Sequence, residues 1–172
     1  MSYNHISYIT PIWNLAANRF NPKRILELGC GCSSYVMRWL WPNAEMVVID
    51  DHAIWMRLLN EMGGYHINKI MYEKTKEGIL NQLASNGKFD FIFVDSGHLY
   101  NDSGKWRVDF MKYIRENEVI NPEGIMVLHD ANRPEYQEES NNWPHCLKLK
   151  VYATYIMTMK KLKYKTMKVT PS

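Results

Sequence analysis

The feature of the chain that most constrains its fold is the stretch Arg24-Ile25-Leu26-Glu27-Leu28-Gly29-Cys30-Gly31-Cys32-Ser33-Ser34. It begins with residues typical of a buried strand, turns at two glycines and continues with hydroxyl side chains that begin a helix. Glycine lets a backbone turn sharply and approach a ligand closely, and a helix N-terminus presents unpaired N–H groups to an anion. The stretch therefore predicts a strand, a loop that binds a nucleotide cofactor, and a helix.

Two classes of cofactor compete for this loop. A dinucleotide-binding fold requires G-x-G-x-x-G, and Ser34 occupies the third glycine position here. Glu27 lies two residues before the first glycine, where dinucleotide folds need no acid. A carboxylate aimed into the loop suits a cationic ligand, and S-adenosylmethionine carries both a sulfonium and an ammonium group. The residues therefore favour an S-adenosylmethionine site.

A second predicted strand follows at the distance that such a loop requires. Residues 45–50 read Glu-Met-Val-Val-Ile-Asp, and Asp50 lies 21 residues after Gly29. In a β-α-β unit, a carboxylate at about this distance reaches the ribose hydroxyls of the nucleotide. Asp50 is therefore the predicted ribose ligand.

Helical and strand patterns alternate along the rest of the chain. Apolar residues recur at helical spacing over 10–20, 36–41, 55–62 and 102–116, and Trp13, Trp55 and Trp106 are predicted to face the core. Apolar runs over 89–95 and 124–128 are typical of strands buried on both faces, and polar residues follow each run. This alternation predicts a mostly parallel sheet with ligands at the carboxyl ends of its strands.

Four motifs, in order, resemble one known family. The glycine-rich motif over 27–31 is similar to that of class I S-adenosylmethionine-dependent methyltransferases. G-x-G-x-S-[ST] at 29–34, an acid followed by a tryptophan at 50–55, and blocks similar to D-G-x-H-x-Y and P-G-G-x-x-x-x-H-D at 95–100 and 122–130 resemble a small O-methyltransferase-like subgroup. The resemblance covers roughly residues 20–130. Ser96 and Glu123 stand where those relatives usually have glycine.

This resemblance implies a Rossmann-like three-layer α/β sandwich, with a mostly parallel seven-stranded sheet and a C-terminal antiparallel hairpin. It also implies methyl transfer, with S-adenosylmethionine as the cofactor. The residues predicted to contact the cofactor follow the first, second and fourth strands and are Glu27, Gly29, Cys30, Gly31, Ser33, Ser34, Asp50, Asp51 and Asp95.

The residues after the fourth strand narrow the acceptor chemistry. Methyl transfer to an amine of a base or amide usually goes with an Asn/Asp-Pro-Pro-aromatic loop, but residues 95–98 read Asp-Ser-Gly-His. Transfer to cytosine C5 needs a thiol beside this strand, and Cys146 lies far along the chain. An alcohol becomes a good nucleophile when a base removes its proton. We therefore expect methylation of a hydroxyl on a small-molecule or sugar-type acceptor.

Three residues are candidates for the base, namely Asp95, His98 and His129. His98 is favoured because a neutral imidazole accepts a proton near pH 7, with Asp95 orienting it or the acceptor. Each candidate also has another interpretation: Asp95 suits a helix N-cap, His98 suits a role in holding the loop, and His129 suits a position against the adenine of the cofactor or under the rim of the sheet.

Asp95 and Asp130 end neighbouring predicted strands, so they are also candidates to share Mg²⁺, a cation that prefers oxygen ligands. Asp130 equally suits a helix N-cap. In catechol O-methyltransferase, which the topology resembles, an asparagine adjoins the comparable acids. Here Ala131 follows Asp130, and Asn132 comes one residue late.

Length and composition bound the organisation of the chain. With 172 residues, 46% of them hydrophobic, it can bury one sizeable core, so we expect one domain over 1–172. Its parts are an N-terminal helical segment (1–22), a cofactor-binding core (23–130) and C-terminal strands (131–172). No apolar run approaches ~20 residues and no secretion signal is present, so we expect a cytoplasmic protein without membrane partners. Cys30 and Cys32 lack the C-x-x-C spacing of redox or zinc sites.

The C-terminal segment is basic, with seven lysines and no acid from Lys148 to Lys168 in a chain of formal net charge +3. We expect an irregular chain over 131–144 and a terminal hairpin over 162–169 with a bulge near Thr166. The lysines suit the solvated face of an edge hairpin, but also an anionic partner such as RNA. Two alternatives therefore stay open: an RNA methyltransferase that uses this segment, and a catalytically idle cofactor-binding protein. The oligomeric state is also open.

Overall fold

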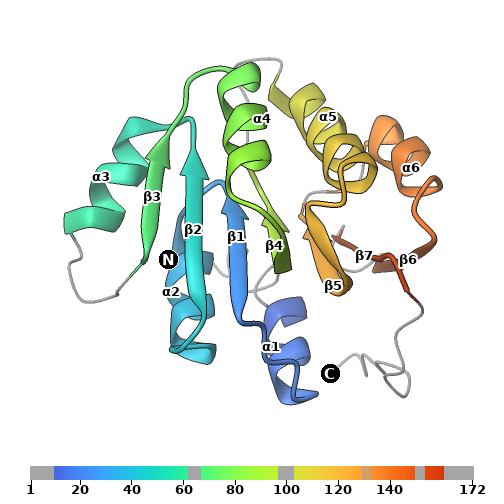
Figure 1. Ribbon diagram of the computed structural model, residues 1–172, viewed down its shortest axis with the longest axis horizontal. Coiled ribbons are helices and arrows are strands. Elements are labelled where there is room, and N and C mark those ends of the chain that lie inside the picture. Colours follow the sequence, from blue (N-terminus) through green and yellow to red (C-terminus); the bar gives the residue numbers. More distant parts are fainter. Residues whose placement is uncertain are drawn as a thin grey trace.

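A seven-stranded sheet forms the centre of the structure, a computed structural model that describes residues 10–61, 67–96, 103–129, 131, 133–149 and 154–160. The strands are β1 (Arg24–Leu28), β2 (Glu45–Asp50), β3 (Lys69–Tyr72), β4 (Phe89–Val94), β5 (Ile120–Leu128), β6 (His145–Leu149) and β7 (Thr154–Thr158). Their order in the sheet is β3-β2-β1-β4-β5-β7-β6 (Figure 1). The first five strands along the chain pair in parallel, and β7 runs antiparallel between β5 and β6.

This arrangement confirms the predicted mostly parallel sheet with a C-terminal antiparallel hairpin. The chain leaves β1 toward β2 and β3 and returns on the other side of β1 as β4, so the strand order reverses between β1 and β4. In open α/β sheets, ligands bind at the carboxyl ends of the strands beside such a reversal. The fold therefore places the candidate site at the ends of β1, β2 and β4.

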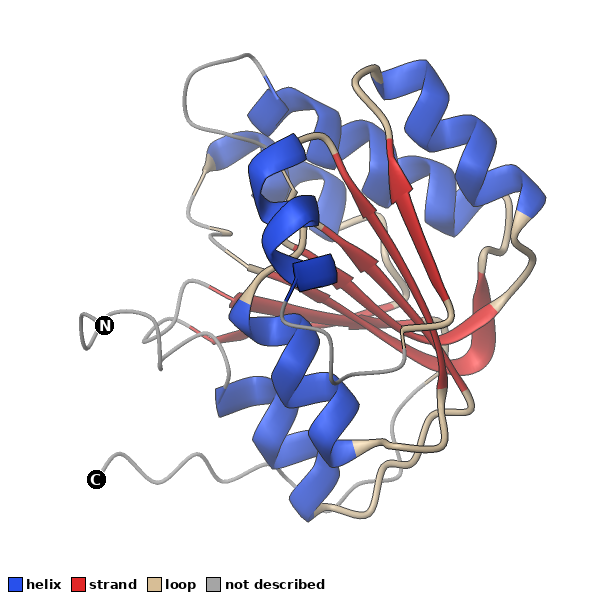
Figure 2. Ribbon diagram, turned by 90° about the vertical axis from the view of Figure 1, so that its left-hand side faces the viewer, coloured by secondary structure: helices blue, strands red, loops and turns tan. Residues whose placement is uncertain are grey.

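In the described part of the chain, helices cover both faces of the sheet (Figure 2). They are α1 (Thr10–Ala17), α2 (Cys32–Leu40), α3 (Ala53–Glu61), α4 (Lys76–Ser85), α5 (Ser103–Glu116) and α6 (Pro134–Ser140). Apolar side chains of α1, α2 and α3 pack in one core cluster, and those of α4, α5 and α6 pack in the other. The expected Rossmann-like three-layer α/β sandwich is therefore confirmed.

The central strands are apolar on both sides because both sides are covered. In β4, Phe91 and Phe93 belong to the cluster of α1 to α3, whereas Ile92 and Val94 belong to the cluster of α4 to α6. All four side chains are fully buried. A continuous apolar run is what a parallel strand between two helical layers requires.

Part of the chain predicted to be irregular forms the helix α6, so the prediction for residues 131–144 is wrong there. Pro134 stands in the first turn, where its missing N–H leaves no hydrogen bond unmade. The helix shows little apolar periodicity, and tertiary contacts hold it instead. Tyr136 is 1% exposed, and Glu139 accepts a 3.0 Å hydrogen bond from Arg115 of α5.

Two tryptophans predicted to face the core lie at the surface. Trp13 and Trp55 are 44% and 46% exposed, and the ring centroids of Trp13 and Trp39 are 5.0 Å apart. On α3, Met56 and Leu59 take the buried positions. The predicted apolar face of this helix is therefore confirmed at Leu59 and wrong at Trp55.

Most of the lysine-rich segment, and the hairpin predicted over 162–169, lie outside the described residues. The hairpin that the structure does describe is earlier in the chain, formed by β6 and β7. Lys148 donates to Asn141 at 3.1 Å, and Lys160 lies 3.8 Å from a carboxylate oxygen of Glu123.

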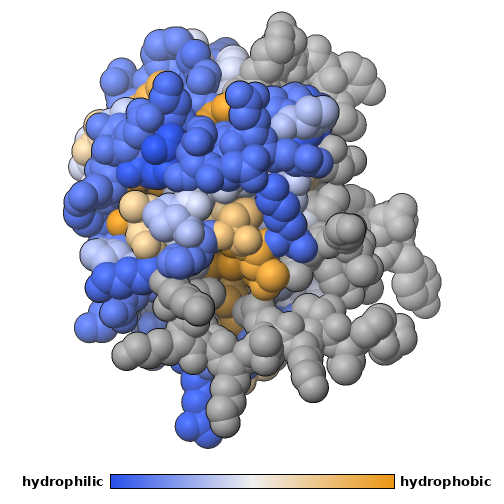
Figure 3. All heavy atoms as spheres, turned by 90° about the vertical axis from the view of Figure 1, so that its right-hand side faces the viewer, coloured by the Kyte–Doolittle hydropathy of each residue, from blue (hydrophilic) through white to orange (hydrophobic). Residues whose placement is uncertain are grey.

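On the side of the molecule at the right of Figure 1, the described residues are mostly hydrophilic, with an apolar area near the middle of the view (Figure 3). Leu147, on the edge strand β6, is 47% exposed. Among the described residues, no helix combines the length and the apolar character that crossing a membrane requires.

Candidate cofactor and active site

Gly29 brings the loop after β1 into contact with the loop after β4. Its φ is +90°, and a Cβ added to it would lie 2.7 Å from both the carbonyl carbon of Asp95 and the backbone nitrogen of Ser96. A larger residue would therefore be strained and would collide with backbone that cannot easily move. The backbone N–H of Asp95 also donates to the carbonyl of Leu28 at 2.8 Å.

Gly31 differs from Gly29, because its φ of 166° is an extended conformation and a Cβ added there would meet nothing within 4 Å. Its N–H donates to the hydroxyl of Ser34 at 3.1 Å, at the start of α2. The glycine leaves open space beside the backbone at a helix N-terminus. That space fits a cofactor lying against the loop.

Glu27 is fully buried at the end of β1 and holds the start of α2. Its two carboxylate oxygens accept hydrogen bonds from the hydroxyls of Ser33 and, at 2.6 Å, Ser34. Burial raises the pKa of Glu27 to about 8; the two hydroxyls oppose the shift, and the charges of Asp50 and Asp95 add to it. Glu27 thus organises the loop through Ser33 and Ser34.

Asp50, the last residue of β2, ties the loop after β1 to the loop after β2. One carboxylate oxygen accepts from the N–H of Cys30 at 2.5 Å, and the other accepts from the N–H of His52 at 2.6 Å. Burial and the neighbouring Asp50 charge raise the pKa of the Cys30 thiol, which therefore stays protonated. Asp51 follows on the loop and is half-buried.

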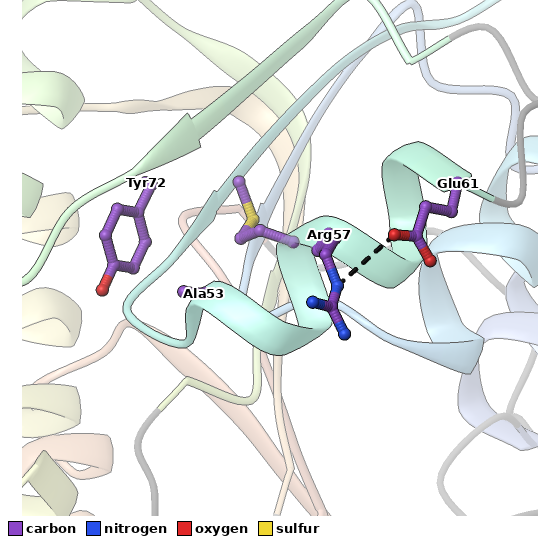
Figure 4. A pocket seen from close by; sticks show the side chains of 5 residues that line it. Ala53, Arg57, Glu61 and Tyr72 are labelled. Atoms are coloured by element: carbon purple, nitrogen blue, oxygen red, sulfur yellow. Dashed lines mark ion pairs between the residues drawn. The ribbon is translucent and has the colours of Figure 1, made fainter.

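An open pocket of about 450 Å³ lies between α3 and the end of β3. Tyr72 lines it from the end of β3, where it is the register partner of Asp50, and the other lining residues belong to α3: Ala53, Met56, Arg57 and Glu61. In Figure 4, Tyr72 and Ala53 lie at one side and the Arg57–Glu61 ion pair, at 3.4 Å, lies at the other.

At the ends of β4 and β5, Asp95 and His129 form a pair that a buried arginine holds. Nδ1 of His129 lies 3.1 Å from a carboxylate oxygen of Asp95. Arg107 of α5 donates to the same oxygen at 3.3 Å, to the carbonyl of His129 at 2.9 Å, and to the carbonyl of Ser96. Arg107 is 6% exposed. A positively charged clamp thus joins the two strand ends.

Comparison with solved structures identifies the fold that carries this site. Human methyltransferase-like protein 13 in complex with SAH matches with a TM-score of 0.69 and 11% identity, covering 97% of this chain and 86% of that one. SAH-bound methyltransferase PaMTH1 of Podospora anserina matches with a TM-score of 0.65 and 18% identity, covering 94% and 80%. The chain has the fold of a class I S-adenosylmethionine-dependent methyltransferase. The N-methyltransferase NodS of Bradyrhizobium japonicum WM9, in complex with SAH, has the same fold (TM-score 0.61, 15% identity, covering 90% and 85%).

Comparison with models of protein families and with curated proteins gives no match. The structural likeness therefore establishes the methyltransferase fold, and it does not decide the acceptor.

In this methyltransferase fold, the residues predicted to contact the cofactor gather as expected from the strand order. Residues 29–34, Asp50, Asp51 and Asp95 lie at or just after the carboxyl ends of β1, β2 and β4. Of the predicted base candidates, Asp95 and His129 are in contact, whereas His98 lies outside the described residues. Whether each of these residues touches a ligand stays a prediction.

The predicted metal ligands are only partly described, because Asp130 lies outside the described residues. Within the described ranges, no three His, Cys, Asp or Glu side chains form a group that could hold a metal ion.

Sequence reasoning missed Arg107 and Tyr72. Neither belongs to a recognisable motif, and only the packing of α5 and β3 brings them to the site. The one sequence signal that could have indicated Arg107 is its position on an otherwise apolar helix face. A guanidinium buried there needs a carboxylate or carbonyl partner.

Proposed function

We propose that this protein is an S-adenosylmethionine-dependent methyltransferase that methylates a hydroxyl group of a small-molecule or sugar-type acceptor. The observation that carries the proposal is the contact of Gly29 with Asp95 and Ser96. This contact supports the proposal because it brings the loop after β1 directly beside the residues that follow β4, where Asp95 pairs with His129.

The cofactor's nucleoside end is assigned to the β2 side of the site. Asp50 uses one acceptor position on each oxygen for backbone N–H groups, and a carboxylate offers about four, so it retains capacity for a ribose hydroxyl. Asp51 is next to it. The pocket between α3 and the end of β3, where Tyr72 is the register partner of Asp50, presents the ring of Tyr72 and the side chain of Met56, which suit the flat apolar faces of adenine. When bound, S-adenosylmethionine supplies an electrophilic methyl group.

The base is assigned to His129. Asp95 lies 3.1 Å from Nδ1 of His129 and orients the imidazole at the ends of β4 and β5. Asp95 also stabilises the imidazolium that forms when His129 takes the acceptor's hydroxyl proton. The sequence favours His98 as the base, so His98 is the alternative. Separate substitutions of His98 and His129 distinguish the two assignments.

Electrostatics favour proton transfer over metal activation at Asp95. The carboxylate oxygen nearest His129 is already 3.3 Å from the Arg107 guanidinium, which would repel a divalent cation placed on that oxygen. Mg²⁺ at Asp95 and Asp130 is therefore not part of the proposed mechanism. Unchanged turnover after exhaustive EDTA treatment is the expected result.

A methyl-transfer screen tests the proposal. The protein is incubated with methyl-labelled S-adenosylmethionine and, separately, with pools of hydroxylated small molecules, glycans and RNA. We expect label in a small-molecule or glycan pool, and loss of that transfer in His129→Ala. Label in RNA alone would overturn the acceptor class. Cofactor binding without transfer to any pool would favour an idle cofactor-binding protein.

A further inference from the structure

The hydroxyl of Ser96 is buried and has no hydrogen-bond partner among the described residues. Ser96 directly follows the Asp95 of the site, and the residue is 4% exposed. Buried hydroxyls in proteins are nearly always paired, and an unpaired one destabilises the folded protein. The unpaired hydroxyl of Ser96 therefore indicates a hydrogen-bond partner that the protein itself does not supply, namely a ligand.

The backbone of Ser96 lies between Gly29 and Arg107. Its nitrogen lies 2.7 Å from the place that a Cβ on Gly29 would occupy, and its carbonyl accepts from Nε of Arg107. Rotation about the Cα–Cβ bond is then the only freedom that redirects the hydroxyl. Ser96 therefore lies between the cofactor loop and the arginine clamp.

The order of the strands decides which part of the cofactor Ser96 would meet. β1 lies between β2 and β4 (Figure 1). A cofactor with its ribose at Asp50, on β2, extends across the end of β1 and brings its opposite end to β4. That opposite end carries a carboxylate and an ammonium group, and a hydroxyl can donate to the first or accept from the second.

We propose that the Ser96 hydroxyl binds the amino-acid end of S-adenosylmethionine. This inference rests on the proposed function and adds a specific contact to it. The relatives that the motifs resemble usually have glycine at this position, so the contact is a property of this chain and not of the motif.

Ser96→Ala tests the inference by two measurements on the same protein. Calorimetric titration with S-adenosylhomocysteine should show affinity weakened roughly tenfold, as expected for loss of a hydrogen bond to a charged group. Affinity for 5′-methylthioadenosine, which lacks the amino-acid end, should be unchanged. The melting temperature of the unliganded variant should equal or exceed that of the wild type, because an unpaired buried hydroxyl is removed.

Ser140→Ala is the matched control. Ser140 is also fully buried, but its hydroxyl donates to the carbonyl of Gln137 at 2.8 Å, far along the chain on α6. This variant should melt at a lower temperature and bind S-adenosylhomocysteine as tightly as the wild type.

The inference is overturned if Ser96→Ala binds S-adenosylhomocysteine as tightly as the wild type, or if its affinity for both ligands falls equally. It is also overturned if the variant melts below the wild type by as much as Ser140→Ala. The proposed function fails separately, and this inference with it, if the wild-type protein binds neither ligand.

Discussion

Nδ1 of His129 lies 3.1 Å from Oδ1 of Asp95, although the two residues follow different strands of the sheet. The backbone reinforces this contact, because the N–H of His129 donates to the carbonyl of Val94, at the end of β4. A histidine oriented by a carboxylate is a common arrangement for a general base.

Asp95→Asn and His129→Gln should therefore slow methyl transfer far more than they weaken cofactor binding. General-base catalysis contributes about 10²–10⁴-fold, so a drop of roughly this size in kcat is expected for His129→Gln. Steady-state kinetics with an identified acceptor measures it. If His98→Ala removes turnover and His129→Gln does not, the base is His98.

The two glycines of the cofactor loop should respond differently to the same substitution. Gly29→Ala should lower the melting temperature, because φ is +90° and the new Cβ would meet Asp95 and Ser96 backbone at 2.7 Å. Gly31→Ala meets open space, so its melting temperature should stay close to that of the wild type while S-adenosylhomocysteine affinity falls. Equal effects of both substitutions on stability would contradict this assignment.

Glu27 should make the stability of the protein depend on pH. Its pKa is about 8 in the folded protein against 4.5 ordinarily, so the folded state binds more protons than the unfolded state between these values. The free energy of unfolding should then fall as pH rises from about 4.5 to about 8, by on the order of a few kcal/mol.

Glu27→Gln should flatten this pH dependence, because an amide does not titrate. Urea unfolding of both proteins at pH 5, 6, 7 and 8, pH values chosen to span about this interval, measures it. Parallel curves for the two proteins would show that Glu27 is not protonated in the folded state.

Arg107→Ala should destabilise the protein by about 2–4 kcal/mol, because it leaves the buried carbonyls of Ser96 and His129 without their donor. Arg57→Ala is the matched control. Its side chain is 69% exposed and forms an ion pair with Glu61 on the same helix, so a change within about 0.5 kcal/mol is expected. Equal unfolding free energies for both variants would mean that Arg107 does not clamp the two strand ends.

The sequence predicts those parts of the structure that local pattern determines. Alternating strands and helices, and the acids at strand ends, place Asp50 and Asp95 at one edge of a parallel sheet, where the structure has them. Glycine spacing predicts the loop, but only the structure separates the strained, crowded Gly29 from the open Gly31.

Features that depend on tertiary packing cannot be predicted from local sequence patterns. α6 has few apolar residues and is held by contacts of Tyr136 and Glu139. β3 has four residues, none of them fully buried, so its pattern is weak. Arg107 reaches the site only because α5 packs across the ends of β4 and β5.

The central claim is that the ends of β1, β2 and β4 form an S-adenosylmethionine site, and calorimetric titration of the full chain tests it most directly. The account predicts saturable binding of S-adenosylmethionine and S-adenosylhomocysteine at one site per chain, no binding of NAD, and much weaker binding in the well-folded Gly31→Ala variant. Absence of binding by the wild-type protein, or undiminished binding by Gly31→Ala, would contradict it.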